Sequence, residues 1–516
     1  MTISSTRGAG GARPDFPVEE ATVAELQTAM QDGRLTAEAL TDIYLRRIQA
    51  IDRHGASLRS VQESNPDALA IARALDEERR AKGARGPLHG IPVLLKDNIA
   101  TADRTETTAG ALALVGARPR QDATIARKLR DAGAVLLGKA SMSEWAYFKA
   151  TPSSSGWSAR NGQARNPYAL DRTPCGSSSG SASAVAASLA AVSIGTETDG
   201  SIVCPAGANN VVGIKPTVGL TSRLGVIPIS ATQDTVGPFG RTVADAAVVL
   251  GALTGVDPRD AVTRASAGRG HTDYTRFLDA DGLRGARIGV PREGYFGHSA
   301  KADAVTEQAI AALREAGAVV VDPVKIPNFD RAALTASERI VLLHEFKAGV
   351  NAYLAEWTVG ASVKSLEDVI AFNARHAVEN LPFFGQELLV RAQATGGLTQ
   401  PEYLQALESN RRLAGRDGLD ALMDQERLDA LVAPTIMPAW KIDLVNGDPA
   451  RESSAKSAAL AGYPLISVPA GYALGLPVGI TFMGRAWSEP TLIRLAYAFE
   501  QTTKARRPPQ YPATTP

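Results

Sequence analysis

Residues 174–205 read PCGSSSGSASAVAASLAAVSIGTETDGSIVCP, and this stretch decides how the rest of the chain is interpreted. Its first part, Gly176 to Ser183, has the composition of a flexible Gly/Ser linker. The serines nevertheless run directly into an Ala/Val/Leu segment from about Ser181 to Val192, and a linker does not usually open a buried helix. We therefore predict a Gly/Ser turn at a helix N-terminus, where several backbone N–H groups and hydroxyls face one point and suit a developing negative charge.

A second serine-bearing turn follows at the end of this stretch, Thr198-Asp199-Gly200-Ser201. Gly200 lets the chain approach a substrate closely, and successive amides around a nucleophile can form an oxyanion hole. Ser201 alone would be interpreted as a turn serine bonded to the backbone. Its place behind the first serine turn makes it a candidate nucleophile.

A serine nucleophile needs a base, and the usual candidate is histidine. No histidine lies in a local nucleophile motif, and no Gly-x-Ser-x-Gly elbow of the hydrolase kind is evident. The six histidines are His54, His89, His271, His298, His344 and His376. A lysine can replace histidine where burial lowers its pKa and no carboxylate pairs with it. Lys96, at the end of the apolar run Ile91 to Leu95, is our candidate; the alternative is a strand-end lysine in solvent or paired with Asp97.

The composition excludes several classes of protein. The 516 residues carry 55 Lys+Arg against 54 Asp+Glu, a formal charge of +1, so no field of one sign favours nucleic acid. The longest weakly apolar run, Ala182 to Gly195, is too short to span a bilayer, which takes roughly 20 residues. Met1 to Glu20 has no apolar core for a signal peptide, and two cysteines cannot build a disulfide framework. We expect a cytoplasmic protein with no membrane or nucleic-acid partner.

Helical patterns alternate with short apolar strands along the chain, which predicts an α/β fold with a sheet covered on both faces. We predict a flexible tail at 1–20, a single domain over 21–505 and a mobile tail at 506–516. Within the domain, the core motifs occupy 90–240 and 428–500, and a largely helical excursion occupies about 332–424.

Several separated motifs, in this order, resemble the amidase signature family. They are GIPVLLKDN at 90–98, GSSSGS at 176–181, GTETDGS at 195–201 and GIKPT at 213–217, and the resemblance continues at DTVGP (234–238) and GLPVGITFMG (475–484). It covers nearly all of the chain after the N-terminal tail. The resemblance implies a large mixed β-sheet with helices on both faces, and cleavage of amide bonds by a Ser-cisSer-Lys triad without metal or organic cofactor.

Carried over by position, the resemblance assigns three roles. Ser201 is the nucleophile that becomes the acyl-enzyme. Ser177, held by a cis peptide bond, relays protons between Ser201 and the base Lys96. The backbone N–H groups of Thr198, Asp199, Gly200 and Ser201 are implied to line the oxyanion hole.

Two departures from the common family pattern carry information. Most members have Gly at the position of Asp199 and Arg at that of Val203, and the variant here is similar to bacterial peptide amidases, which remove the C-terminal amide of peptides as ammonia. The block 155–167 also resembles that subgroup. It makes Ser155 and Trp157 candidate substrate-binding residues, although Trp157 suits a packing role equally well.

The leading hypothesis is therefore a peptide amidase that needs no obligate protein partner. One alternative is a broad amidase acting on aryl or aliphatic amides. An alternative of another class is the amidase-like subunit of a tRNA-dependent amidotransferase, against which the near-neutral charge and the departures at Asp199 and Val203 argue. A binding protein that has lost catalysis is disfavoured because Lys96, Ser177 and Ser201 occur together.

Cys175 and Cys204 bracket the two serine turns. A functional thiol and a disulfide are both conceivable. Small buried hydrophobes are the favoured interpretation.

Overall fold

The computed structural model describes residues 16–450 and 452–515, and in these residues one mixed sheet organises the chain. Its strands follow the order β1-β4-β2-β7-β9-β8-β14-β15-β13-β10-β11. They are β1 (Val61–Ser64), β2 (Pro92–Lys96), β4 (Val135–Ala140), β7 (Val192–Glu197), β8 (Val212–Lys215), β9 (Thr235–Gly240), β10 (Arg287–Pro291), β11 (Val319–Val324), β13 (Ala430–Pro434), β14 (Leu465–Ala473) and β15 (Leu476–Met483). Strand β2 pairs in parallel with β4 and β7, whereas β7 pairs antiparallel with β9. The predicted mixed sheet is confirmed.

Short ribbons flank this sheet: β3 (Arg118–Pro119) pairs with β12 (Thr358–Val359), and β5 (Trp157–Ser158) pairs with β6 (Gly162–Gln163). The α-helices are α1 (Val23–Gln31), α2 (Ala37–Arg47), α3 (Ala68–Lys82), α4 (Thr124–Asp131), α5 (Ser179–Ala186), α6 (Val203–Ala208), α7 (Val243–Leu253), α8 (Ala300–Glu315), α9 (Arg331–Trp357), α10 (Leu366–Arg375), α11 (Ala377–Asn380), α12 (Glu387–Gln393), α13 (Pro401–Asn410), α14 (Ala421–Gln425), α15 (Lys456–Ala461) and α16 (Glu489–Thr503). Short 3-10 or π turns are η1 (Ile48–His54), η2 (Leu112–Leu114), η3 (Glu144–Tyr147), η4 (Ala261–Ser266), η5 (Thr275–Phe277) and η6 (Arg411–Asp420).

Both faces of the sheet are covered, and β13 shows how. Alternate side chains of a strand point to opposite faces. Ala430 and Val432 pack in a core cluster that includes residues of α7, α8 and α16, whereas Leu431 and Ala433 pack in a different cluster that includes residues of α14 and α15. Because both faces of the sheet are covered, its buried strands have continuous runs of apolar residues.

The motif that ends at Lys96 forms an interior strand of this sheet. All residues of β2 are buried, and the strand lies between β4 and β7. A β-branched and leucine-rich run with a polar turn behind it is suited to such a position. Lys96 therefore stands at the carboxyl end of β2, inside the molecule.

The helix after the first serine turn is shorter than expected. The sequence predicts it from about Ser181 to Val192, but α5 ends at Ala186. Ser188 adopts a left-handed conformation (φ 51°), and the Leu189 amide closes the turn onto the carbonyl of Ala184. Val192 already belongs to β7, because the central sheet takes up the β-branched residues that follow.

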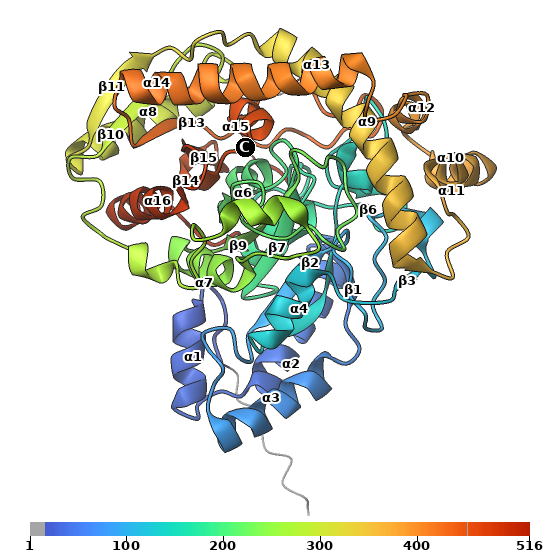
Figure 1. Cartoon of the computed structure of the whole chain (residues 1–516). Helices are drawn as coiled ribbons and strands as arrows, with labels where there is room; N and C mark the ends of the chain where they lie inside the picture. Colours follow the sequence, from blue (N-terminus) through green and yellow to red (C-terminus); the bar gives the residue numbers. More distant parts are fainter. Residues whose placement is uncertain (1–15, 451, 516) are drawn as a thin grey trace, which may run out of the picture.

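The stretch 332–424 is largely helical, as predicted, running from α9 through α14. Figure 1 shows α13 and α14 along the top of the molecule and α9 descending at the right, with α1–α3 at the bottom. Helix α9 also contributes several residues to the cavity described below. The division of the chain into a core and an excursion stays a prediction.

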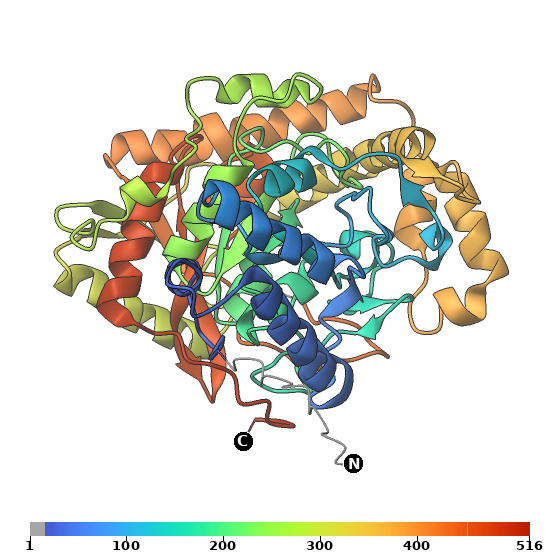
Figure 2. The ribbon, with the colours of Figure 1, turned by 90° about the horizontal axis from the view of Figure 1, so that it is seen from below.

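The expected tails need correction. Residues 1–15 lie outside the described part, but Glu20 pairs with Arg506 at 2.7 Å. The segment 506–515 is not a free tail, because Leu170 N–H donates to the carbonyl of Pro512 at 2.9 Å and Asp171 N–H to that of Ala513 at 3.2 Å. Figure 2 shows this irregular segment leaving α16 at the margin of the molecule.

Candidate active site

The side chain of Lys96 ends among polar atoms rather than in solvent. Its Nζ lies 2.8 Å from Ser177 Oγ, 2.8 Å from Thr196 Oγ1 and 3.0 Å from the Thr196 carbonyl oxygen. Asp97, the alternative partner, instead accepts hydrogen bonds from the hydroxyl of Thr108 at 2.5 Å and from the amide of Gly110 at 3.0 Å. Lys96 thus contacts a predicted triad partner and is neither solvent-exposed nor paired with Asp97.

Burial decides the protonation state of this lysine. Lys96 is 0% exposed, and desolvation lowers its pKa to about 7, while the charges of Asp234 and Glu197 oppose that shift. Removing an ammonium group from water destabilises its charged form by more than the two carboxylates stabilise that form. A substantial fraction of Lys96 is therefore the neutral amine near pH 7, able to accept a proton.

The two serine turns meet beside this amine. The peptide bond between Gly176 and Ser177 is cis, as the resemblance implied. Ser178 N–H donates to the carbonyl of Ser201 at 3.2 Å, which joins the turns. Between the hydroxyls of Ser177 and Ser201 the described structure contains no hydrogen bond, but both residues line the same cavity.

This cavity has a volume of about 530 Å³, within the range of small-molecule sites. Its wall includes both serine turns, one face of α9 and the loop before α15. The lining residues are Ala146, Tyr147, Phe148, Thr151, Pro152, Gly176, Ser177, Thr198, Asp199, Gly200, Ser201, Cys204, Ile229, Arg331, Thr335, Glu338, Arg339, Leu342, Leu388, Ile436, Asp448, Pro449, Ala450, Glu452, Ser453 and Lys456.

A buried carboxylate holds the Ser201 turn from behind. Glu197 accepts the amides of Gly200 at 2.9 Å, Ile202 at 2.7 Å and Val203 at 2.9 Å. Burial raises the pKa of the Glu197 carboxyl, and the charge of Lys215 and these amide bonds oppose the rise. Glu197 is not among the residues predicted from the sequence, although an acid at the end of a buried strand, just before a Gly-Ser turn and a helix, is a recognisable anchor.

The same bonds correct one part of the expected oxyanion hole. Gly200 has φ +85°, a left-handed conformation that favours glycine, and its N–H is committed to Glu197. The amides of Asp199 and Ser201 make no hydrogen bond within 16–450 and 452–515. Thr198 lines the cavity, and its hydroxyl donates to Asp234 at 2.5 Å.

Asp199 belongs to an ion cluster in the cavity wall. Lys456 Nζ lies 2.6 Å from Asp199 Oδ2 and 2.5 Å from Glu338 Oε2, and Gln233 donates to Glu338 Oε1 at 2.8 Å. Burial alone would lower the pKa of Lys456, but the two carboxylates outweigh it and raise that pKa. The cluster links the turn of Ser201 to α9 and α15.

Ser155 and Trp157 are not among the described residues that line the cavity. Ser155 donates through its N–H at 3.0 Å and its hydroxyl at 2.7 Å to Asp448, which does line the cavity. Trp157 is buried and packs edge-on against Phe383 and Phe384. The side chain of Ser155 is used in a hydrogen bond and that of Trp157 in packing, and a direct contact of either with the substrate stays a prediction.

The cysteines are bonded to each other, contrary to the favoured interpretation as separate hydrophobes. A disulfide joins Cys175 to Cys204 across a Cα–Cα distance of 6.0 Å. It ties the residue before Gly176 to the first turn of α6. Disulfides persist mainly in oxidising compartments, so this bond does not favour the predicted cytoplasmic location.

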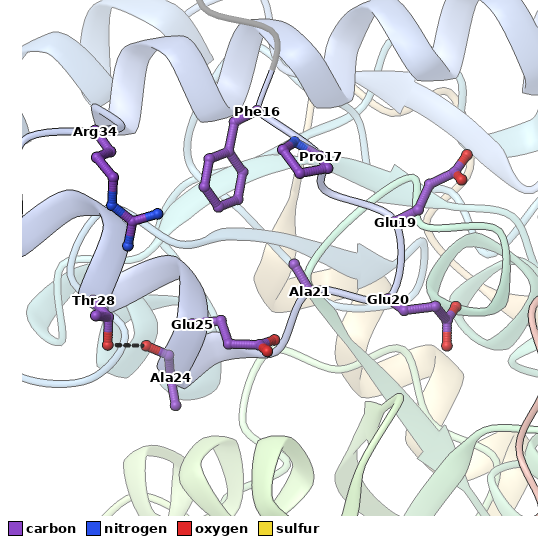
Figure 3. Close-up of a pocket in the computed structure, with 9 residues that line it drawn as sticks. All are labelled: Phe16, Pro17, Glu19, Glu20, Ala21, Ala24, Glu25, Thr28 and Arg34. Carbon is purple, nitrogen blue, oxygen red and sulfur yellow. Dashed lines mark hydrogen bonds between the residues drawn. The ribbon is translucent and has the colours of Figure 1, made fainter.

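A second cavity, of about 580 Å³, lies beside α1 (Figure 3). Its lining residues are Phe16, Pro17, Glu19, Glu20, Ala21, Ala24, Glu25, Thr28 and Arg34. The acids there already have partners, since Glu20 pairs with Arg506 and Glu25 caps α1 through Thr22. None of the triad residues is among the described residues of this cavity.

The described residues offer neither a metal site nor a membrane span. They hold no group of three or more His, Cys, Asp or Glu arranged to bind a metal ion. None of their helices combines the length and the apolar character that crossing a membrane requires.

Comparisons with known proteins agree with this geometry. The family model described as Amidase matches residues 39–493. The chain belongs to the amidase family. A probable amidase of Arabidopsis thaliana is 45% identical over 503 residues, which make up 96% of this chain and 92% of that protein. One subunit of the glutamyl-tRNA(Gln) amidotransferase of Halorhodospira halophila is 36% identical over 500 residues, 94% of this chain and 98% of the subunit.

Solved amidase structures share the whole fold. The native peptide amidase of Stenotrophomonas maltophilia superposes with a TM-score of 0.92 at 55% identity, covering 96% of this chain and 99% of that one. A peptide amidase bound to the competitive inhibitor chymostatin gives the same TM-score at 56% identity, covering 96% and 100%. The chain is therefore a hydrolase that acts on amide C–N bonds.

Proposed function

We propose that this amidase removes the C-terminal carboxamide of peptides as ammonia, through an acyl-enzyme on Ser201. The observation that carries the proposal is the 2.8 Å contact between the buried amine of Lys96 and Ser177 Oγ, at the cavity that Ser201 also lines. A base without a bulk-solvent shell, next to a relay hydroxyl and a second serine, is suited to activating a nucleophile. The cavity beside α1 holds no such set among its described residues.

In the first step, neutral Lys96 takes the proton of Ser177 while Ser177 takes that of Ser201. Ser201 Oγ attacks the carbonyl carbon, and the negative charge develops on the carbonyl oxygen. The amides of Asp199 and Ser201 are free to donate to that oxygen, because they have no partner in the described residues. The Gly200 amide acts differently: with Glu197 it fixes the turn.

The second half of the acylation runs the relay in reverse. The C–N bond breaks as the leaving nitrogen receives a proton from Ser177, and Lys96 returns a proton to Ser177. Ammonia leaves, and an ester to Ser201 remains. Water then attacks the ester, giving up a proton along the same relay, and the peptide acid is released with Ser201 restored.

Two observations support peptide amides as the substrate class. The cavity of about 530 Å³ has room for a dipeptide amide and is lined by both charged and apolar side chains. Structures titled as peptide amidases match at 55% and 56% identity over 96% of the chain. We also propose that no partner subunit is needed, since every group in this scheme comes from one chain.

The test measures ammonia released from an N-acetyl dipeptide amide by the wild type and by Ser201→Ala, with an aryl amide and free glutamine as further substrates. We expect release by the wild type, an intact internal peptide bond, and a higher kcat/KM for the dipeptide amide than for the aryl amide. A higher kcat/KM for the aryl amide would favour the broad amidase. Glutamine turnover only in the presence of partner subunits would favour the amidotransferase.

A further inference from the structure

One oxygen of the Asp199 carboxylate has no protein partner among the described residues. Oδ2 binds Lys456 at 2.6 Å, whereas no hydrogen bond reaches Oδ1 from the described part of the chain. The side chain of Asp199 keeps 22% of its surface exposed, and the residue lines the cavity of Ser201. A carboxylate oxygen in a confined cavity usually accepts a hydrogen bond. In this cavity a bound substrate can supply the donor.

Within the cluster around Asp199, it is this carboxylate that is open to the cavity. Two carboxylates, Asp199 and Glu338, share the single ammonium of Lys456. Both oxygens of Glu338 are used, by Lys456 and by Gln233, and its side chain is only 6% exposed. Burial and the charge of Asp199 raise the pKa of the Glu338 carboxyl, so Asp199 is the carboxylate of the cluster that faces the cavity.

The other charged side chains described in the cavity wall do not pair with Asp199. Arg331 pairs with Glu452 at 2.8 Å. Asp448 binds Ser155, and Arg339 makes no hydrogen bond or ion pair with Asp199 in the described structure. Lys456 fixes Asp199 from one side and leaves the other side open.

Asp199 belongs to the same turn as the candidate nucleophile, and both residues line the cavity. Asp199 lies two residues before Ser201, in the turn whose amides are free to receive the carbonyl oxygen. When the carbonyl oxygen of a bound carboxamide accepts hydrogen bonds from those amides, its NH2 group lies on the other side of the carbonyl carbon. In the hydrolysed product a second carboxylate oxygen takes the place of that NH2.

We propose that Asp199 Oδ1 accepts a hydrogen bond from the NH2 group of the scissile carboxamide, and thereby selects the uncharged primary amide and expels the carboxylate product. This inference rests on the proposed function. The amide gains a charge-assisted hydrogen bond. The product brings a like charge against Asp199, and such juxtaposition is a strong means of discrimination.

Asp199→Asn tests this, because it removes the charge and gives the side chain a donor of its own. The substrates are an N-acetyl dipeptide amide and the methyl ester of the same peptide, whose leaving group has no N–H. The inhibitor is the corresponding free acid. The matched control is Glu452→Gln, which removes one negative charge from the same wall, where Glu452 pairs with Arg331 and not with Lys456.

We expect the ratio of kcat/KM for amide over ester to fall at least tenfold in Asp199→Asn and to stay within twofold in Glu452→Gln. The inhibition constant of the free acid should fall at least tenfold in Asp199→Asn only. An equal loss on amide and ester would overturn the inference, because it would place Asp199 at a backbone N–H or in a structural role.

A binding measurement keeps the test valid if the variant turns over poorly. In the Ser201→Ala background, Asp199→Asn should tighten the Kd of the free acid at least tenfold relative to that of the amide. An unchanged Kd ratio overturns the inference, with the proposed function intact as long as the wild type releases ammonia. A wild type that hydrolyses no peptide amide overturns both.

Discussion

The side-chain nitrogen of Lys96 and the hydroxyl oxygen of Ser177 lie 2.8 Å apart, although 81 positions separate them in the chain. Strand β2 delivers the lysine from inside the sheet, and the turn before α5 delivers the serine. Lys96 is buried, whereas Ser177 lines the cavity. The pair therefore combines a base shielded from water with a hydroxyl that faces the space for a substrate.

The activity should depend on the protonation of Lys96. Because burial lowers the pKa of Lys96 to about 7, the neutral base is lost as pH falls through that value. We expect kcat/KM for a peptide amide to fall about tenfold per pH unit well below pH 7 and to level off above pH 8. A profile from pH 5 to 9 with a neutral substrate checks this, and a rate flat through the acid range would contradict a lysine base.

The three triad residues should depend on one another, so that loss of any one of them removes most of the catalytic activity. Ser201→Ala removes the nucleophile, and we expect kcat to fall by about 10³-fold or more, with the fold unchanged by circular dichroism. Ser177→Ala and Lys96→Ala should each cost a comparable factor, and the double variant Lys96→Ala/Ser177→Ala no more than either alone. The decisive result against the relay would be a double variant whose loss equals the product of the two single losses.

The sequence was sufficient for the strand that carries Lys96 and for both serine turns, because each has a local signal: an apolar run closed by a polar turn, and Gly/Ser at a helix start. The cis bond and the triad came from resemblance, not from periodicity. Contacts between segments that are distant in the sequence were not predicted. Lys456 binds Asp199 from 257 positions away and Glu338 from 118 positions away, and no local pattern predicts either contact.

Other errors have a similar physical origin. The helix expected up to Val192 ends earlier, and Val192 begins β7. The β-branched residues of β7 are suited to a strand, and the strand is stabilised by pairing with β9, which is distant in the sequence. The tail after Arg506 reads as polar and proline-rich, yet its backbone bonds residues 167–171.

The disulfide should contribute measurably to stability. It closes a loop with a sequence separation of 29 between the two serine-bearing segments. For a loop of that length the chain-entropy model gives about 3 to 4 kcal/mol. We expect Cys175→Ala/Cys204→Ala to lower the free energy of unfolding by that amount. Reductant should lower the Tm of the wild type but not that of the variant, and a reductant effect of equal size on both would contradict a bridge.

Glu197 should act on catalysis through the turn that it anchors. Glu197→Gln replaces one acceptor oxygen by an NH2 group that faces backbone amides, so at least one of the three bonds to Gly200, Ile202 and Val203 is lost. We expect kcat to fall by about 10-fold to 100-fold with KM little changed, because a turn displaced by a fraction of an ångström is felt most in the transition state. The free energy of unfolding should fall by about 2 to 4 kcal/mol.

Glu500→Gln is the matched control, since Glu500 on α16 is also poorly exposed and accepts a backbone amide, that of Val243 at 2.8 Å, away from the cavity. This control should lose stability while keeping kcat within about twofold, because its amide partner belongs to α7. Steady-state kinetics at a temperature well below both melting transitions, together with urea unfolding, separate the two effects. If both variants lost kcat in proportion to their stability, Glu197 would be a general fold-stabilising acid and not the support of the Ser201 turn.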